Sequence, residues 1–123
     1  MQPADRARIA IYADEPALVR SIQCALQAEG YEAGEMSWAA ALYGIGEAPD
    51  LFLIDRGTED RDGMQVVTRL LDEGWDATPK IAMSASPEWL RTASESALFD
   101  AVLDKPFDVA ELLRCVERHA ATA

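Results

Sequence analysis

The sequence contains no apolar run that approaches the roughly 20 residues needed to cross a bilayer. Residues 1–6 also lack the pattern of a secretory signal peptide. These two absences predict a cytoplasmic protein without a membrane-spanning helix.

Cysteine is scarce, and the two thiols, Cys24 and Cys115, lie far apart in the chain. Neither belongs to a C-x-x-C pair, so neither a zinc site nor a redox-active dithiol is indicated. We expect both to be reduced thiols on helices.

Basic residues are also few: 11 Lys and Arg stand against 22 Asp and Glu, which gives a formal net charge of −11. This excess of negative charge repels the phosphate backbone of nucleic acids and anionic membrane surfaces. Direct binding to either is therefore not expected, and protein partners are favoured.

Apolar residues, in contrast, make up 50% of the 123 residues. At this size, folding buries about two-thirds of the surface of the unfolded chain, which is enough for a proper core. No linker, repeat or low-complexity tract interrupts the sequence. We expect residues 1–123 to form one domain with no output domain.

Short apolar segments alternate with stretches of helical periodicity. Strands are predicted at residues 8–12, 31–36, 51–54, 80–83 and 101–103. A continuous apolar run such as 51–54 is typical of a strand buried on both faces of a parallel sheet. Five such βα units predict an α/β fold with helices on both faces of the sheet.

Helix boundaries have recognisable signals. Pro16 suits a first turn, Gly30 and Gly74 suit helix ends, and Asp108 followed by Glu111 is an N-cap signature. The expected apolar stripes are Leu18, Ile22, Ala25 and Leu26; Val67, Leu70 and Leu71; and Val109, Leu112, Leu113 and Val116. Two weaker helices are predicted at 37–43 and after Ser86-Pro87. Ser and Thr in the latter predict a mobile or irregular segment.

Asp55 is the first polar residue after the apolar run 51–54. In open parallel sheets, ligands bind just beyond the carboxyl ends of the strands, which would place Asp55 in the ligand crevice. The alternative is that its carboxylate only accepts hydrogen bonds from nearby backbone N–H groups.

Other polar residues follow the other predicted strands, and the shared sheet edge should bring them to Asp55. These residues are Asp14, Glu15, Ser84 and Lys105. Two carboxylates 4 Å apart repel by about 4 kcal/mol at an effective dielectric near 20, so a cation is expected beside them. Carboxylate oxygens suit Mg²⁺. An ammonium and a hydroxyl would further stabilise a phosphoryl group on Asp55.

Five short motifs occur in a characteristic order and spacing. They are Ala13-Asp14-Glu15-Pro16, Asp50-Leu51-Phe52-Leu53-Ile54-Asp55, Asp62-Gly63, Met83-Ser84-Ala85 and Lys105-Pro106-Phe107. On these motifs the sequence, from Arg8 to His119, resembles a response-regulator receiver domain of two-component signalling. The resemblance implies a flavodoxin-like (βα)5 three-layer sandwich with a five-stranded parallel sheet of order 2-1-3-4-5. It also implies a cis peptide between Lys105 and Pro106.

The resemblance also implies roles for individual residues. Asp55 would accept a phosphoryl group from a phosphohistidine of a sensor histidine kinase or a histidine phosphotransfer protein. Mg²⁺ or Mn²⁺ would be held by Asp14, Asp55 and the backbone carbonyl of Gly57, while Ser84 and Lys105 would bind the phosphoryl group. Such a domain phosphorylates and dephosphorylates itself, has no turnover on outside substrates, and acts on a downstream protein by contact.

Two departures from the family pattern concern the metal. Ala13 stands where most receivers carry a second acid, which predicts weaker Mg²⁺ binding. The alternative is a pseudo-receiver that binds partners without phosphorylation. Glu59 stands where relatives usually carry proline. It could lend the metal a carboxylate or simply be solvated, and Arg56 could pair with Glu59 or Asp60.

Other departures concern the readout and the lifetime of the phosphoryl group. Val102 stands where relatives carry a switching Tyr or Phe, so a switch would have to run through Ser84. Trp89 is either a substitute reporter or a packing residue. Gly57 and Ser86 occupy the positions that tune dephosphorylation, and their small size predicts a short-lived phosphoryl group.

Two further functions share parts of this pattern. A phosphohydrolase like the haloacid dehalogenases would need a second Asp at the position of Gly57. A flavodoxin-like electron carrier would need a phosphate-binding loop rich in Ser, Thr and Gly after the first strand, and none is present. Both are disfavoured.

Overall fold

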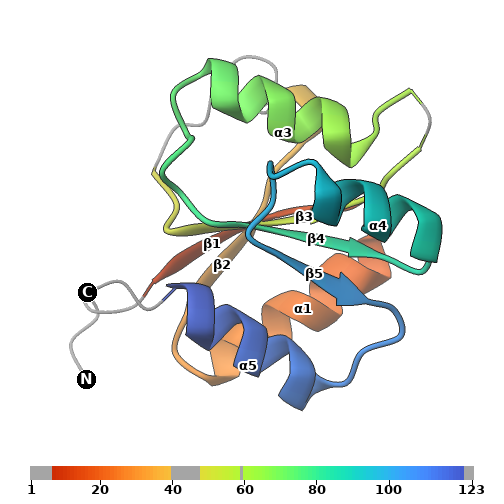
Figure 1. Cartoon of the computed structure of the whole chain (residues 1–123). Helices are drawn as coiled ribbons and strands as arrows, with labels where there is room; N and C mark the ends of the chain where they lie inside the picture. Colours follow the sequence, from red (N-terminus) through yellow and green to blue (C-terminus); the bar gives the residue numbers. More distant parts are fainter. Residues whose placement is uncertain (1–6, 40–47, 59, 121–123) are drawn as a thin grey trace.

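A parallel sheet forms the centre of the computed structural model, which describes residues 7–39, 48–58 and 60–120. Its strands are β1 (Arg8–Tyr12), β2 (Glu32–Glu35), β3 (Leu51–Asp55), β4 (Lys80–Ser84) and β5 (Ala101–Asp104). They are hydrogen-bonded in the order β2-β1-β3-β4-β5 (Figure 1). The predicted strand order and fold class are therefore confirmed.

The register of the strands brings their carboxyl ends to one edge of the sheet. Asp55, the last residue of β3, lies beside Met83 of β4, and Ser84, the last residue of β4, lies beside Asp104 of β5. Both strands thus extend one residue beyond the predicted apolar runs. All residues of β3 and β4 are buried because helices cover both faces of the sheet.

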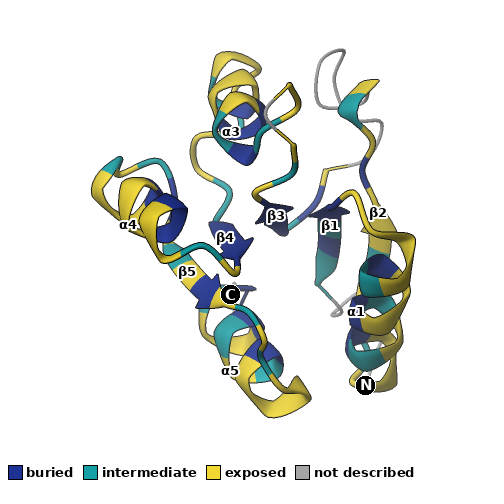
Figure 2. Ribbon diagram, turned by 90° about the vertical axis from the view of Figure 1, so that its right-hand side faces the viewer, coloured by how far each residue is buried: buried dark blue, intermediate teal, exposed yellow. Residues whose placement is uncertain are grey.

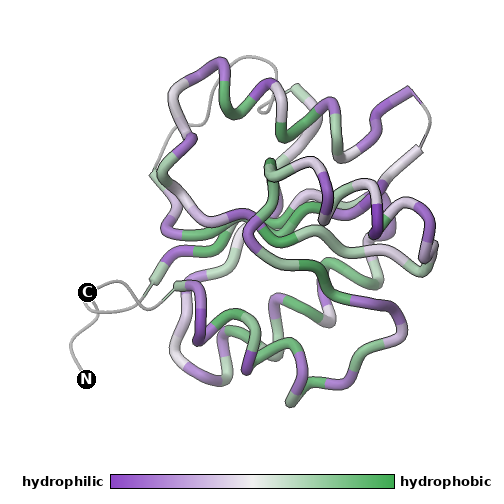
Figure 3. Tube along the Cα trace, viewed as in Figure 1, coloured by the Kyte–Doolittle hydropathy of each residue, from purple (hydrophilic) through white to green (hydrophobic). Residues whose placement is uncertain are grey.

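Helices cover the two faces in pairs. α1 (Pro16–Ala28) and α5 (Val109–Ala120) pack on one face, and α3 (Gly63–Asp72) and α4 (Pro87–Glu95) pack on the other. Figure 2 shows the buried residues in the strands and on the sides of the helices that face them. Figure 3 shows the same pattern as hydrophobic segments along the central strands. The result is a three-layer sandwich with one apolar core on each side of the sheet.

Most of the predicted boundary signals are confirmed. α1 begins at Pro16, and Gly30 follows its end with φ 95°. At the start of α5, the Asp108 amide donates to Glu111 Oε1 (3.1 Å) and the Glu111 amide donates to Asp108 Oδ1 (2.8 Å). The Lys105-Pro106 peptide is cis, as the family resemblance implied.

Two predictions about helices are wrong. The segment after Ser86 is not irregular but forms the regular helix α4, whose Trp89 and Leu90 are buried in the core. Val109 does not belong to the buried stripe of α5 and is 56% exposed. The predicted helix at 37–43 runs into residues 40–47, which lie outside the described part.

Within the described residues, Cys24 and Cys115 form no disulfide, as expected. The helices in this part of the chain are too short or too polar to span a bilayer.

Candidate functional site

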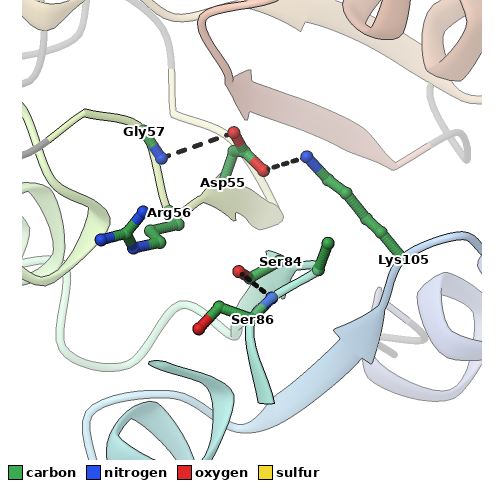
Figure 4. Close-up of a pocket in the computed structure, with 7 residues that line it drawn as sticks. Asp55, Arg56, Gly57, Ser84, Ser86 and Lys105 are labelled. Carbon is green, nitrogen blue, oxygen red and sulfur yellow. Dashed lines mark hydrogen bonds and ion pairs between the residues drawn. The ribbon is translucent and has the colours of Figure 1, made fainter. Parts of the chain in front are cut away.

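A cleft of about 390 Å³ opens at the carboxyl edge of the sheet. It is lined by Asp55, Arg56, Gly57, Ser84, Ala85, Ser86 and Lys105 (Figure 4). The structure thus brings together five residues that sequence reasoning singled out: Asp55, Gly57, Ser84, Ser86 and Lys105. Asp14, which was predicted to bind the metal, does not line this cleft.

Asp55 is the buried acid of the cleft, with only 6% of its surface exposed. Its Oδ1 lies 2.5 Å from the Lys105 ammonium nitrogen. No hydrogen-bond donor of the described residues is aligned on that buried oxygen, so its interaction with Lys105 is an ion pair. Oδ2 accepts one long bond, from the Gly57 amide at 3.4 Å. Capping of backbone N–H groups therefore accounts for little of its position.

Lys105 is placed over Asp55 by the end of β5, where its amide donates to the Ser84 carbonyl (2.9 Å). Its ammonium also lies 3.6 Å from Glu15 Oε1. The Glu15 side chain is 67% exposed, and an ion pair in such a position contributes little. The buried contact with Asp55 is therefore the stronger of the two, and it leaves the ammonium facing the cleft.

Ser84 lies 3% exposed at the end of β4. Its Oγ accepts a hydrogen bond from the Ser86 amide (2.9 Å), which leaves the hydroxyl proton free to be donated elsewhere. The Ser86 hydroxyl in turn accepts from the Trp89 amide (3.2 Å) and caps the N-terminus of α4. Ser84 is thus joined through Ser86 to the helix beyond it.

Asp14 follows β1 in an exposed bend and makes no hydrogen bond or ion pair with the described residues. It follows β1 at the same edge of the sheet as Asp55. Burial raises the pKa of Tyr12, and the negative charges of Asp14 and Asp55 raise it further. Ala13, beside it, is buried and offers no ligand.

Few oxygen donors of the described residues are available to a divalent metal at this edge of the sheet. The described residues contain no group of three His, Cys, Asp or Glu side chains that could hold one. The available oxygen donors are two carboxylates, of Asp14 and Asp55, and the Gly57 carbonyl. Mg²⁺ is commonly held by one or two carboxylates, with several waters retained. The site therefore fits Mg²⁺ and does not fit a metal that requires three protein side chains.

The loop after β3 has a constrained backbone at Gly57, whose φ is 73°. A Cβ there would lie 2.4 Å from the Arg61 carbonyl oxygen, closer than real Cβ atoms approach. The residue must be glycine for this loop to keep its shape.

Four other residues that the sequence singled out are Arg56, Glu59, Trp89 and Val102. Glu59 lies outside the described residues. Arg56 makes no ion pair with Asp60. Val102, in β5, is 39% exposed and has no aromatic ring to swing between two positions. Trp89 is buried, with its ring 6.0 Å from that of Phe99, so packing explains it.

Tyr12 was missed by the sequence reasoning. Its ring is buried in the core under α3, and its hydroxyl donates to the Arg61 carbonyl (2.9 Å) in the loop after β3. A signal was present, because a buried tyrosine usually finds a partner for its hydroxyl.

Comparison with known proteins identifies the class to which this fold and site belong. Residues 9–117 match the family model of the response regulator receiver domain. The chain therefore belongs to this family and is a receiver domain of two-component signalling, which confirms the resemblance seen in the sequence.

Individual relatives agree with this assignment. The chain is 36% identical over 122 residues to the KDP operon transcriptional regulatory protein KdpE of Escherichia coli K12. The match covers 93% of this chain and 53% of KdpE, so the chain spans about half the length of that relative.

Two solved structures show the same fold. One is the receiver domain of sensor histidine kinase PA1611 from Pseudomonas aeruginosa PAO1, solved with a magnesium ion in its active-site cleft. Its TM-score is 0.83 and its sequence identity is 24%, and the match covers 95% of this chain and 99% of that one. The response regulator TrrA of Thermotoga maritima, solved with Mg(2+)-BeF, has a TM-score of 0.78 and 26% identity, with 91% and 97% covered.

Proposed function

We propose that this receiver domain is a phosphoacceptor of a two-component phosphorelay, and that Asp55 is the residue that accepts the phosphoryl group. The donor is a phosphohistidine on a sensor histidine kinase or a histidine phosphotransfer protein. The observation that carries the proposal is the buried Asp55 carboxylate, which lies in an open cleft with the Lys105 ammonium at 2.5 Å. Membership of the receiver family supports the same role.

The chemistry assigns a task to each residue of the cleft. A carboxylate oxygen of Asp55 attacks phosphorus, a P–O bond forms, and the P–N bond to the donor imidazole breaks, with its electron pair returning to the ring nitrogen. Lys105 neutralises negative charge on the transferred group, and the Ser84 hydroxyl donates a hydrogen bond to it. Hydrolysis of the acyl phosphate restores Asp55, so no outside substrate is turned over.

We assign Mg²⁺ binding, or Mn²⁺ in its place, to Asp14, Asp55 and the Gly57 carbonyl. When bound, the ion supplies positive charge to the phosphoryl oxygens. TrrA, which is similar to this chain, was solved with Mg(2+)-BeF, and this supports the assignment. With Ala13 in place of an acid, the two carboxylates assigned to the ion, those of Asp14 and Asp55, offer it two negative charges.

The output is a protein contact, either with a downstream target or with a phosphotransfer protein. Among the described residues, the large hydrophobic side chains that are exposed are Val102 on β5 and Val109 on α5. We propose that the partner binds to the surface of α4, β5 and α5, the elements that include these two valines. The net charge of −11 supports a protein rather than nucleic acid as the direct contact.

The central experiment measures intact mass after incubation with Mg²⁺ and acetyl phosphate. The wild-type protein is expected to gain one phosphoryl group and to lose it again within hours, since Gly57 and Ser86 leave room for water. Asp55→Asn is expected to gain none, because the amide oxygen is a much weaker nucleophile. A wild-type protein that gains no mass, and whose Trp fluorescence does not respond to beryllofluoride, would be a pseudo-receiver.

A second prediction restores the missing acid. Ala13→Asp is expected to lower the Mg²⁺ dissociation constant by about tenfold, because affinity rises with the number of charged ligands. Titration followed by Trp fluorescence measures this change. Ala13→Asn is the matched control: it has nearly the same shape but no charge, and its affinity should stay near the wild-type value. Equal affinities of the Asp and Asn variants would contradict the assignment of Ala13 to the metal site.

A further inference from the structure

Tyr12 links β1 to the loop that follows the acceptor strand. Its side chain lies in the apolar core beneath α3, and the residue is only 2% exposed. Its hydroxyl donates a hydrogen bond to the Arg61 carbonyl oxygen at 2.9 Å, across 49 positions of the sequence. The ring is held by packing, so the hydroxyl has a fixed position under the loop.

The loop itself is closed by backbone contacts. Gly57 and Asp62 form an isolated antiparallel bridge, and the Gly63 amide donates to the Arg56 carbonyl (2.7 Å). Arg61 therefore lies on the returning arm of the loop, opposite Gly57 on the outgoing arm.

The two arms and Tyr12 meet at one place. A Cβ built on Gly57 would lie 2.4 Å from the Arg61 oxygen and 3.6 Å from Cε2 of Tyr12. The oxygen that accepts the Tyr12 hydrogen bond is thus also the atom packed against Gly57. Movement of the returning arm away from Tyr12 would remove the support on which Gly57 rests.

This support bears on metal binding because the Gly57 carbonyl is one of few ligands that the described residues offer at this site. Ala13 contributes no oxygen, so the orientation of the remaining donors has a larger influence on affinity than it would in a site with a third carboxylate. A ligand held in place before binding costs less entropy when the ion arrives.

We propose that Tyr12 is a positioning residue for the metal site: through its hydrogen bond to the Arg61 carbonyl, it holds the loop so that the Gly57 carbonyl faces the ion. This inference rests on the proposed function, since it assumes that Gly57 binds Mg²⁺.

Tyr12→Phe tests this role because it removes the hydroxyl and keeps the ring. The variant is expected to bind Mg²⁺ about threefold to tenfold more weakly, as measured by titration with Trp fluorescence. Urea unfolding, followed by far-UV circular dichroism, establishes that the variant is folded under the titration conditions. Amide hydrogen exchange at Gly63 is expected to be faster, because the loop has lost its tie to β1.

Tyr31→Phe is the matched control. Tyr31 is partly buried just before β2 and packs on the opposite core, and its hydroxyl makes no hydrogen bond to the described residues. Its removal is expected to leave Mg²⁺ affinity unchanged.

The outcomes separate this inference from the proposed function. If wild-type protein binds Mg²⁺ and the folded Tyr12→Phe variant binds it equally well, Tyr12 has only a structural role and the inference is overturned, while the phosphoacceptor function stands. If wild-type protein does not bind Mg²⁺ at all, the metal assignment fails and the inference fails with it. Weaker binding in Tyr12→Phe alone, with Tyr31→Phe unchanged, supports the positioning role.

Discussion

Gly57→Ala is expected to lower the free energy of unfolding by about 2–5 kcal/mol. An alanine at φ 73° carries strain of about 1–2 kcal/mol. Its Cβ would also lie 2.4 Å from the backbone oxygen of Arg61, and overpacking of this kind costs about 1–3 kcal/mol. Urea denaturation measures the loss, and a parallel Mg²⁺ titration should show weaker binding because the loop that carries the proposed ligand must move.

Two other glycines separate these contributions. Gly74 has φ 94° and no atom within 4 Å of an added Cβ, so Gly74→Ala should show the backbone strain alone. Gly34 lies in β2 with no positive φ and with open space around it, so Gly34→Ala should be neutral or slightly stabilising. If Gly57→Ala lowered the free energy of unfolding by no more than Gly74→Ala does, the contact of the added Cβ with Arg61 would not contribute to the loss.

The sequence predicted the cleft because parallel strands impose a simple geometry. Asp55, Ser84 and Lys105 are far apart in the chain, yet each follows a strand, and all strands of a parallel sheet end at the same edge. The N-cap pair of Asp108 and Glu111 was likewise visible in local sequence, whereas the cis peptide before Pro106 was implied only by the family resemblance.

The features that were not predicted depend on contacts between distant segments. The bond from Tyr12 to the Arg61 carbonyl requires the register of β1 against the loop after β3, which no local pattern contains. The segment of α4 was expected to be irregular because it contains Ser and Thr. Burial of Trp89 and Leu90 against the sheet outweighs the low helix propensity of these Ser and Thr residues.

Lys80 is another feature that only tertiary structure explains. It begins β4 at the edge opposite the cleft and is 2% exposed, which is rare for lysine. Its ammonium donates to the carbonyl oxygens of Trp75 and Thr78, both at 2.6 Å, and of Asp76 at 3.4 Å. These three bonds close the turn between α3 and β4 around the buried charge.

Lys80→Met is expected to lower the free energy of unfolding by about 1–3 kcal/mol, because the methionine fills similar space but leaves these carbonyls without their donor. Phosphorylation of Asp55 should be unchanged, since Lys80 is remote from the cleft. Arg69→Met, which removes an exposed cation from α3, is the control and should change stability by no more than about 0.5 kcal/mol. A Lys80→Met variant as stable as wild type would show that the cost of burying the charge cancels its three bonds.

The difference in the free energy of unfolding between wild type and Lys80→Met is expected to depend on pH, because Lys80 titrates. Burial lowers the pKa of Lys80 below its ordinary value of 10.5, although the charges of Asp100 and Asp76 oppose the shift. The unfolded chain therefore holds the Lys80 proton more tightly than the folded protein. The contribution of Lys80 to stability should rise as the pH increases through the folded pKa toward 10.5.

All other titratable groups are common to both proteins, so subtracting the Lys80→Met unfolding curve from that of wild type isolates this effect. The free energy by which wild type is more stable than Lys80→Met should grow between pH 7 and about pH 10. An advantage that shrinks over this range would mean that the three carbonyls stabilise the ammonium by more than burial destabilises it, and that the turn is held by the charged form of Lys80.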